Sequence, residues 1–202
     1  MNSKRTIKKQ KLVAFIYSAF DGVQLEEGIG LWEAQAEDNP LEDKEWEKQC
    51  LDKAKNDERN DWQKVSLENL IDCGDIINYI DAKGFRYYLP LWLLMDIGYD
   101  DEVIQKQFPH KMMVDIAFHL SRPLEVWANG KYENKFGDNK LSALNHDQKK
   151  CIATYFQYKM NIVKQKYQEY SIQFGSDESE FLNDKAYIAL QKARDFWGNR
   201  IL

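Results

Sequence analysis

The sequence predicts a mainly helical protein, a single irregular helical domain over residues 1–202, in which one small β-hairpin is an open option. Three observations predict this fold class. Apolar residues recur at steps of three and four, capping signals precede several of these patterns, and the chain holds only 10 Gly and 4 Pro. Hydrophobic residues make up 44% and charged residues 30% of the chain. This composition is typical of a globular protein and excludes collagen-like or wholly disordered chains.

The first helix is predicted from an apolar stripe that ends at a turn signal. The stripe consists of Leu12, Phe15, Ile16, Ala19 and Phe20. Asp21 and Gly22 follow it directly and should stop the helix. The basic residues before the stripe also resemble the start of a signal peptide. We favour a retained helix, because an acidic residue comes at once and no small-residue cleavage motif is present.

Residues 24–62 form the most asymmetric stretch of charge, with 13 acidic and 5 basic residues, a local balance of −8. Asn39 as N-cap, Pro40 at the first position and Glu42 three residues after the cap predict a helix that begins at residue 40. Trp46, Cys50 and Ala54 would form its apolar stripe. The other faces are charged, so this helix should lie at the surface.

The middle of the chain predicts a helix, an extended segment and a further short helix. Ser66 should cap a helix that runs through Ile80 and stops at residues 81–84. Residues 85–90 are rich in strand formers and should be extended, and residues 91–97 should form a short helix. The optional hairpin would pair residues 85–89 with 111–120, a run whose apolar residues fit either a helix or a strand.

The remaining residues predict three helices and one irregular segment. Residues 100–108 should be helical and 122–139 irregular, with His110 and Trp127 in or near these segments. A capping box at Asn145 and Gln148 predicts a long helix over 147–170. Asp177 and Glu180 should open the last helix, which ends at Gly198. The connection at 171–179 is the candidate boundary, so 171–202 could form a C-terminal helical extension.

Charge and cysteine content narrow the classes of partner. The net charge of −5 gives no general attraction for nucleic acid, and the few basic residues near the start would bind it weakly. The longest uncharged runs, such as Tyr87–Met95, hold nine residues, which is too short to span a membrane. Three cysteines, an odd number, predict free thiols and a reducing cytoplasmic location. The oligomeric state is not predicted.

The sequence supplies no recognisable catalytic or cofactor motif. The three histidines lack the partner spacing of a zinc site, and no nucleophile elbow, nucleophilic cysteine signature or dinucleotide fingerprint is present. We therefore expect no cofactor and no metal. An enzymatic function is unsupported by these patterns without being excluded.

Arg86 stands among three aromatic residues in the segment Phe85-Arg86-Tyr87-Tyr88. A guanidinium in such a setting can stack on rings or bind a carboxylate. The first interpretation is an internal tie, with Arg86 bound to helix-end carbonyls or to Glu33 or Asp38. The second is a pocket for a small molecule or a reaction, with Arg86, Tyr88, Trp32 and Glu33 around it.

The acidic stretch also holds Trp32, Trp46 and Trp62, which we first interpret as anchors that hold helices down. Indoles in acidic surroundings also suit an interface with a basic protein. The leading functional hypothesis is therefore a protein-interaction module, of the immunity or inhibitor type, whose acidic surface over residues 24–62 binds a basic partner. The predicted ligand- or partner-binding residues are Arg86, Tyr87, Tyr88, Trp32, Glu33, Asp38 and Trp46.

Several motifs prompt a family resemblance. They are Ile16-x-x-Ala19-Phe20, the run Gly28-Ile29-Gly30-Leu31-x-Glu33-Ala34 with Asp38, Asp81-x-x-Gly84-Phe85-Arg86-Tyr87-Tyr88-Leu89-Pro90, and Leu144-x-x-x-Gln148-x-x-x-Ile152-x-x-x-Phe156. Over about residues 12–160 the chain resembles a family of small uncharacterised bacterial proteins, a domain of unknown function. The resemblance implies a soluble, mostly helical bacterial protein without an established activity, and it leaves the tail from 171 outside.

Overall fold

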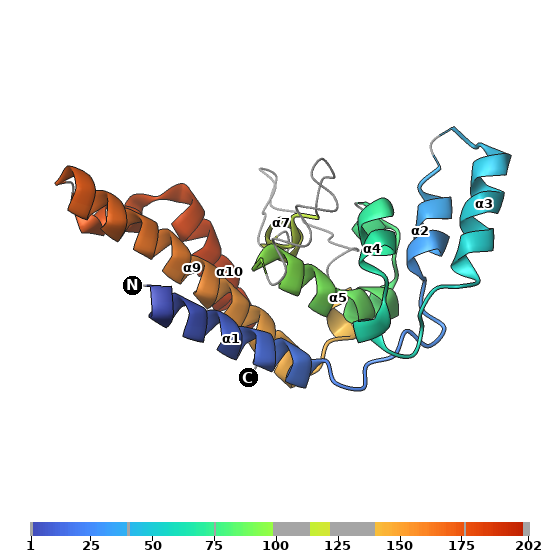
Figure 1. Ribbon diagram of the computed structural model, residues 1–202, viewed down its shortest axis with the longest axis horizontal. Helices are drawn as coiled ribbons and strands as arrows, with labels where there is room; N and C mark the ends of the chain where they lie inside the picture. The colour runs from blue at the N-terminus through green and yellow to red at the C-terminus, as the bar shows by residue number, and fades with distance from the viewer. Residues whose placement is uncertain are drawn as a thin grey trace. The chain divides into compact units, whose positions relative to one another are not determined.

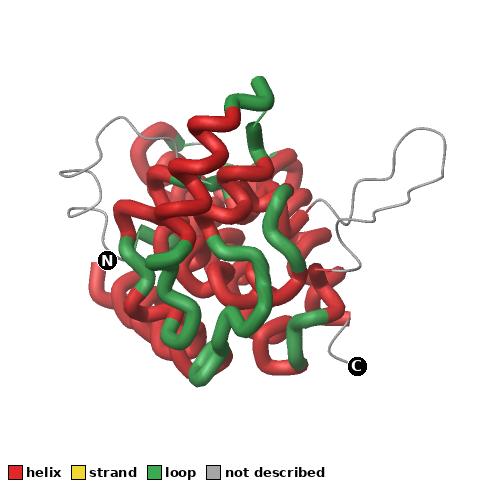
Figure 2. The backbone as a smooth tube through the Cα atoms, turned by 90° about the vertical axis from the view of Figure 1, so that its right-hand side faces the viewer, coloured by secondary structure: helices red, strands yellow, loops and turns green. Residues whose placement is uncertain are grey.

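The computed structural model describes residues 2–39, 41–74, 76–98, 114–121, 140–175 and 177–199. Regular secondary structure within these ranges is helical, and none of these residues lies in a strand (Figure 1, Figure 2). The mainly helical fold class is confirmed. The helix expected over 100–108 and the irregular segment over 122–139 lie outside the described residues, as do His110 and Trp127.

The contacts divide the chain into two compact units, each assembled from segments that are separate in sequence. Unit 1 comprises residues 1–19, 117–133 and 145–202, and unit 2 comprises residues 20–116 and 134–144. The expected single domain over 1–202 stays a prediction. In the described parts of both units, no helix is long and apolar enough to cross a bilayer.

Unit 1 is built around α9 (His146–Phe174), a helix of 29 residues. Both α1 (Asn2–Ala19) and α10 (Lys185–Asn199) pack along α9 (Figure 1). Their buried apolar side chains form the core of this unit and include Leu12, Ile16, Ile152, Tyr155, Phe156, Ala193 and Trp197. The Trp197 indole N–H donates to the carbonyl oxygen of Leu120, at the end of α7 (Ile116–Ser121), over 3.1 Å. This bond satisfies the polar end of a buried ring.

The long helix follows its sequence signals closely. Asn145 Oδ1 accepts from the Gln148 N–H over 2.9 Å, and Gln148 Oε1 accepts from the Asn145 N–H over 3.0 Å, so the predicted capping box is present. The helix continues beyond residue 170 and ends at Gly175, which has a φ of 71°. A left-handed backbone is the ordinary glycine solution for a helix end. The predicted end of α1 near Phe20 is also confirmed.

The last helix begins later than predicted. Asp177 caps the short 3₁₀ helix η4 (Glu178–Asn183), and α10 begins at Lys185. The Asp184 carboxylate takes over the capping role, since it accepts from the Tyr187 N–H over 2.8 Å. Two acidic caps in succession thus start two helices where the spacing predicted one.

Unit 2 holds a series of short helices. They are α2 (Leu31–Glu37), α3 (Lys44–Ala54), η1 (Trp62–Lys64), α4 (Leu67–Asp72), η2 (Ile76–Asn78) and α5 (Ala82–Asp96). Helix α2 packs against α3 and also meets α4 and η2, and α5 packs against η1. The core contains Leu25, Leu31, Trp62, Ile76, Ile77, Tyr87, Tyr88 and Leu93.

Helix α3 begins four residues after the predicted start at residue 40. Asp43 is its N-cap, since its Oδ1 accepts from the N–H groups of Glu45 and Trp46 over 2.9 and 3.1 Å. Asn39 instead pairs twice with the backbone of Asp43, as donor over 2.9 Å and as acceptor over 3.1 Å. Asn39 and Asp43 are both residue types that can cap a helix, and in the structure Asp43 is the one that caps α3.

The helix predicted from Ser66 to Ile80 is interrupted. Ser66 is the N-cap, as predicted, and accepts from the Asn69 N–H over 3.4 Å. The helix ends at Asp72. Gly74 has a φ of 55°, so a right-handed helix cannot continue through this residue. Ile77 therefore lies in η2, although its side chain stays buried.

The prediction of an extended segment over 85–90, and with it the small hairpin, is wrong. Residues 85–89 lie inside α5, and Pro90 sits in the same helix. Asp81 was expected to stop a helix, but its Oδ1 accepts from the Gly84 N–H over 2.8 Å and caps α5. A short apolar run fits a buried helix as well as a strand, and here burial on several sides outweighs the local strand preference.

Candidate functional site

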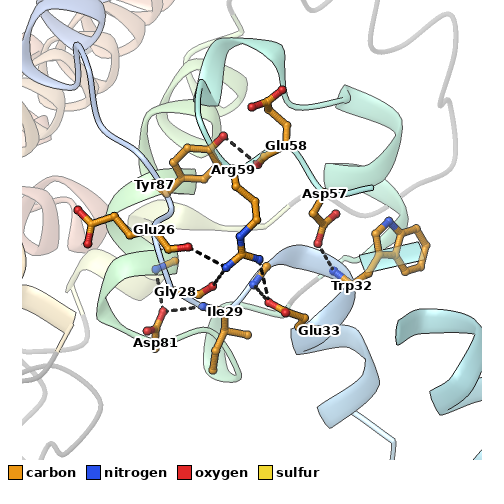
Figure 3. A network of polar contacts seen from close by, with 12 residues as sticks. Glu26, Gly28, Ile29, Trp32, Glu33, Asp57, Glu58, Arg59, Asp81 and Tyr87 are labelled. Carbon is orange, nitrogen blue, oxygen red and sulfur yellow. Dashed lines mark hydrogen bonds and ion pairs between the residues drawn. The ribbon is translucent and has the colours of Figure 1, made fainter. Parts of the chain in front are cut away.

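The site lies where the loop 26–30 crosses the start of α5. A Cβ atom at Gly84 would stand 2.5 Å from the carbonyl oxygen of Ile29, and one at Gly28 would stand 2.7 Å from the Lys83 Cβ. Asp81 Oδ1 also accepts from the Ile29 N–H over 3.1 Å (Figure 3). The two glycines therefore permit a close backbone approach that the Asp81 carboxylate holds together.

Arg59 is at the centre of the network in Figure 3. Its Nη2 donates to the carbonyl oxygens of Glu26 and Gly28 over 2.9 and 2.7 Å, and its Nη1 donates to Glu33 Oε2 over 3.3 Å. The side chain is 33% exposed. One guanidinium thus ties the loop to the first turn of α2, a use to which its rigid fork of donors is suited.

Two carboxylates serve the backbone at the start of α2. Glu33 Oε2 accepts from the Gly30 N–H over 2.6 Å, and Asp57 Oδ2 accepts from the Trp32 N–H over 3.2 Å. The pKa of Asp57 is raised to about 6, chiefly by burial; the hydrogen bond from Trp32 and the charge of Arg59 act against this rise, and the charge of Glu33 adds to it. A carboxyl group that titrates near neutral pH is thus placed beside a second carboxylate.

An open pocket of about 420 Å³, which we call the acidic pocket, lies between α2, α3 and the loop. Its lining combines carboxylates, one guanidinium and an apolar part, namely Glu27, Gly28, Ile29, Glu33, Ala36, Glu37, Glu47, Leu51 and Arg59. Four negative charges thus meet one positive charge. The pocket is suited to a cation that also carries apolar surface.

Two of the four glutamates in the acidic pocket are already paired. Glu27 binds Lys83 over 2.6 Å, and Glu33 binds Arg59 over 3.3 Å. Within the part of the chain that the structure describes, Glu37 and Glu47 form no ion pair. The uncompensated negative charge therefore belongs to these two residues, one on each helix.

A cluster of ion pairs continues from the loop onto α5. Lys83 Nζ binds Glu26 over 2.7 Å in addition to Glu27, and these two hydrogen bonds raise the pKa of Lys83 to about 12. The hydrogen bonds from Lys83 in turn lower the pKa of Glu26 and of Glu27. All three side chains are substantially exposed, so the cluster contributes little to stability.

Arg86 joins the loop by a long contact. Its Nη2 lies 3.4 Å from Glu26 Oε1, and its side chain is 26% exposed. The carboxylate it meets is therefore neither Glu33 nor Asp38, which were the expected partners of an internal tie. Arg86 does not line the acidic pocket. Its Nε is buried and has no hydrogen-bond partner among the described residues.

The other predicted site residues divide into buried and accessible ones. Tyr87, Tyr88 and Trp32 are buried. The Tyr87 hydroxyl donates to the Glu58 carbonyl oxygen over 2.9 Å, and burial raises the pKa of both tyrosines. Lys53 Nζ lies 3.8 Å from the Trp32 ring centroid. These three aromatic residues therefore belong to the core, and none of them lines the acidic pocket.

Asp38 and Trp46 lie on opposite sides of the α2–α3 connection. Asp38 is the C-cap of α2, and its hydrogen bond with Tyr79 raises the pKa of that phenol. Trp46 on α3 is 37% exposed. Trp62, by contrast, is buried, and its indole N–H donates to the Phe20 carbonyl oxygen over 2.8 Å. Of the three tryptophans in the acidic stretch, Trp46 alone offers surface to a partner.

Sequence reasoning missed Arg59 and Asp57, the two residues that organise the loop and the start of α2. One signal could have pointed to Arg59: the other basic residues of the stretch 24–62 are lysines, and Arg59 is its single arginine. An arginine guanidinium among acidic residues has enough N–H donors to bind several carbonyl and carboxylate oxygens at once. No comparable signal marks Asp57 among 13 acidic residues.

The thiols take no part in this site. Cys50, Cys73 and Cys151 are free and buried, and burial raises the pKa of all three, to about 12 for Cys73 and Cys151. Such thiols are poor nucleophiles. Among the described residues, no group of three or more His, Cys, Asp or Glu side chains could hold a metal ion.

Comparison with known proteins places the chain in a family. No curated protein and no solved structure matches it. A sequence model described as a family of unknown function, DUF6714, matches residues 8–201. The match extends through the last helix, so the expectation that the tail from 171 lies outside the family is wrong. The chain belongs to the family of unknown function DUF6714.

Proposed function

We propose that this protein is a protein-interaction module, of the inhibitor or immunity type, that binds a basic partner through the acidic surface of residues 24–62. The observation that carries the proposal is the acidic pocket between α2 and α3, where the carboxylates of Glu37 and Glu47 have no ion-pair partner among the described residues. The apolar floor of the pocket consists of the apolar side chains that line it, Ile29, Ala36 and Leu51. Unpaired carboxylates beside such a surface are a complement to Lys or Arg side chains.

Exposed apolar side chains adjoin this charge. Leu41 is 87% exposed, Leu51 45% and Trp46 37%, and all three lie on α3 or just before it. Protein interfaces combine apolar anchors with a charged rim, and tryptophan is over-represented among the residues that dominate binding. Charge would steer the partner to the surface, and the apolar groups would slow its release.

The proposal is tested by affinity capture with quantitative mass spectrometry. The wild-type protein and the double variant Glu37→Lys, Glu47→Lys serve as baits at about 50 and 300 mM salt. We expect the wild type to capture a defined set of basic proteins at low salt, and we expect both high salt and the double variant to remove them.

The matched control is the double variant Glu169→Lys, Glu180→Lys, which makes the same change of charge at exposed residues of unit 1. It should capture the same proteins as the wild type. The proposal fails if capture is insensitive to salt, if the captured proteins are not basic, or if the control variant loses them equally.

A further inference from the structure

We propose that the acidic pocket receives one arginine side chain of the partner, with its stem on the apolar floor and its guanidinium between Glu37 and Glu47. The inference rests on the proposed function and makes it specific, because it names the chemical group that is recognised. Its basis is the division of the pocket lining into paired charges, unpaired charges and apolar surface.

The size of the pocket fits a side chain. Its volume of about 420 Å³ lies near the lower end of the roughly 300–1,000 Å³ typical of ligand pockets. The pocket is open to solvent, so a group carried on a protein surface can enter. Ile29 from the loop, Ala36 from α2 and Leu51 from α3 supply the apolar floor. A long, flexible stem of methylene groups is the part of a basic side chain that such surface can cover.

The paired charges determine where a cation would sit. Arg59 contacts Glu33 and would repel a second positive group there. Glu37 lies one helical turn further along α2, and Glu47 lines the same pocket from α3. The cationic head is therefore directed to the end of the pocket away from Arg59.

The same arrangement argues against an anionic ligand. Both hydrogen bonds of Arg59 Nη2 go to backbone carbonyls, and Nη1 donates to Glu33. A ligand carboxylate or phosphate would compete with these bonds and approach four glutamates. The charge of the pocket thus favours cationic over anionic ligands, whatever their shape.

The choice of arginine over lysine follows from the two walls. A guanidinium is planar and presents five N–H donors, so one group can bind carboxylates that approach from two helices. An ammonium is more strongly hydrated and costs more to bring against the apolar floor. We therefore expect arginine to bind more tightly than lysine.

The inference is tested by ¹H–¹⁵N NMR titration of the full chain with N-acetyl-L-arginine amide. The neutral isostere N-acetyl-L-citrulline amide and N-acetyl-L-lysine amide are the comparison probes. We expect saturable shifts of the amides of Glu37, Glu47 and Leu51 with the arginine probe, weaker shifts with the lysine probe and none with the citrulline probe. Equal shifts with citrulline would overturn the inference.

Two double variants separate the pocket from general charge. Glu37→Gln with Glu47→Gln removes the two unpaired carboxylates, and Glu42→Gln with Glu45→Gln removes two acidic residues that do not line the pocket. We expect the Kd for the arginine probe to rise about tenfold or more in the first variant and by less than about twofold in the second. Amide spectra without the probe check that both variants stay folded. Equal losses in the two variants would refute the pocket as the binding site.

Failure of this inference can be distinguished from failure of the proposed function. If basic partners are captured, but the variant Glu37→Gln, Glu47→Gln captures them as the wild type does, the interaction module stands and the arginine pocket falls. If the arginine probe binds in the pocket but no salt-sensitive partner is captured, the pocket stands and the proposed function falls.

Discussion

At the scale of single residues, Asp57 is subject to two opposing requirements. Its carboxylate accepts a backbone hydrogen bond, but its buried surroundings disfavour the negative charge. Its Oδ2 accepts from the Trp32 N–H, while burial and the neighbouring Glu33 raise its pKa to about 6. The folded state therefore binds a proton more tightly than the unfolded chain, where an aspartate titrates near about 3.9. The ionised Asp57 lowers stability fully above about pH 6 and not at all below about pH 4.

We predict that Asp57→Asn raises stability at pH 8. The asparagine Oδ1 can still accept from Trp32, and the unfavourable charge is gone. The gain in the free energy of unfolding should be on the order of 1–2 kcal/mol, because solvent screens part of the penalty. Thermal unfolding from pH 4 to 8 measures it: the difference in Tm between variant and wild type should grow as pH rises through 4–6. A variant that is less stable than the wild type at pH 8 would contradict this reading of Asp57.

Gly84 supports a second prediction at this scale, with Gly198 as its control. A Cβ at Gly84 would stand 2.5 Å from a backbone oxygen, and one at Gly198 would meet nothing within 4 Å. Gly84→Ala should lower the free energy of unfolding by about 1–3 kcal/mol, because the loop and α5 must move apart. Gly198→Ala should raise it by up to about 1 kcal/mol, because alanine is the better helix former. Urea unfolding distinguishes the two. Similar effects of both substitutions would mean that the close approach is not needed.

At the scale of elements, the start of α5 depends on Asp81, which joins a cap to a tertiary contact. Its Oδ1 accepts from the Gly84 N–H in the helix and from the Ile29 N–H in the loop. The N-cap of α3, Asp43, also accepts from two N–H groups, but both belong to its own exposed helix. Asp81 therefore stabilises both a helix start and a contact with the loop, whereas Asp43 stabilises a helix start alone.

We therefore predict that Asp81→Ala destabilises the protein more than Asp43→Ala does. Loss of the Asp43 cap should cost about 1 kcal/mol, and loss of Asp81 about 2–3 kcal/mol, since it leaves a part-buried loop N–H without its acceptor. Chemical unfolding measures both, and Asp81→Asn should restore most of the loss. Equal costs for the two alanine variants would show that the bond to Ile29 contributes nothing.

Elements with one strong local signal could be predicted from the sequence. The reciprocal caps of α9, the Ser66 cap and the end of α1 are all where the pattern placed them. Elements decided by competition could not be predicted. Asp43 caps α3 in place of Asn39, and residues 85–90, expected to be extended, are buried within the helix α5. The site divides in the same way. Its acidic character was visible in the composition, but the pairing of Arg59 with Glu33 depends on residues 26 apart in sequence.

At the scale of the whole molecule, the small net charge is the sum of a positive balance in unit 1 and a negative balance in unit 2. The described residues of unit 1 carry 13 basic and 7 acidic side chains, a balance of +6, and those of unit 2 carry 9 basic and 19 acidic side chains, a balance of −10. Helix α1 contributes five basic residues and no acidic one. Each unit therefore presents its own electrostatic field to the solvent, within the limits of screening.

This separation predicts retention on both anion- and cation-exchange resins at pH 7 and low salt, despite the net charge of −5. Lys8→Gln with Lys11→Gln should elute earlier from the cation exchanger, because it weakens the basic surface of α1. Lys44→Gln with Lys48→Gln makes the same change of net charge on α3 and should shift that elution much less. Wild-type protein that passes straight through the cation exchanger would refute the prediction.

The burial of Cys50, Cys73 and Cys151 has a practical consequence for site-specific labelling of the protein. Maleimide reagents need an accessible thiolate, and these three side chains offer neither access nor an easily lost proton. A single cysteine introduced at an exposed position of α3 can therefore carry a fluorophore or a spin label without removal of the native thiols, so the partner-binding surface can be followed in an otherwise wild-type chain.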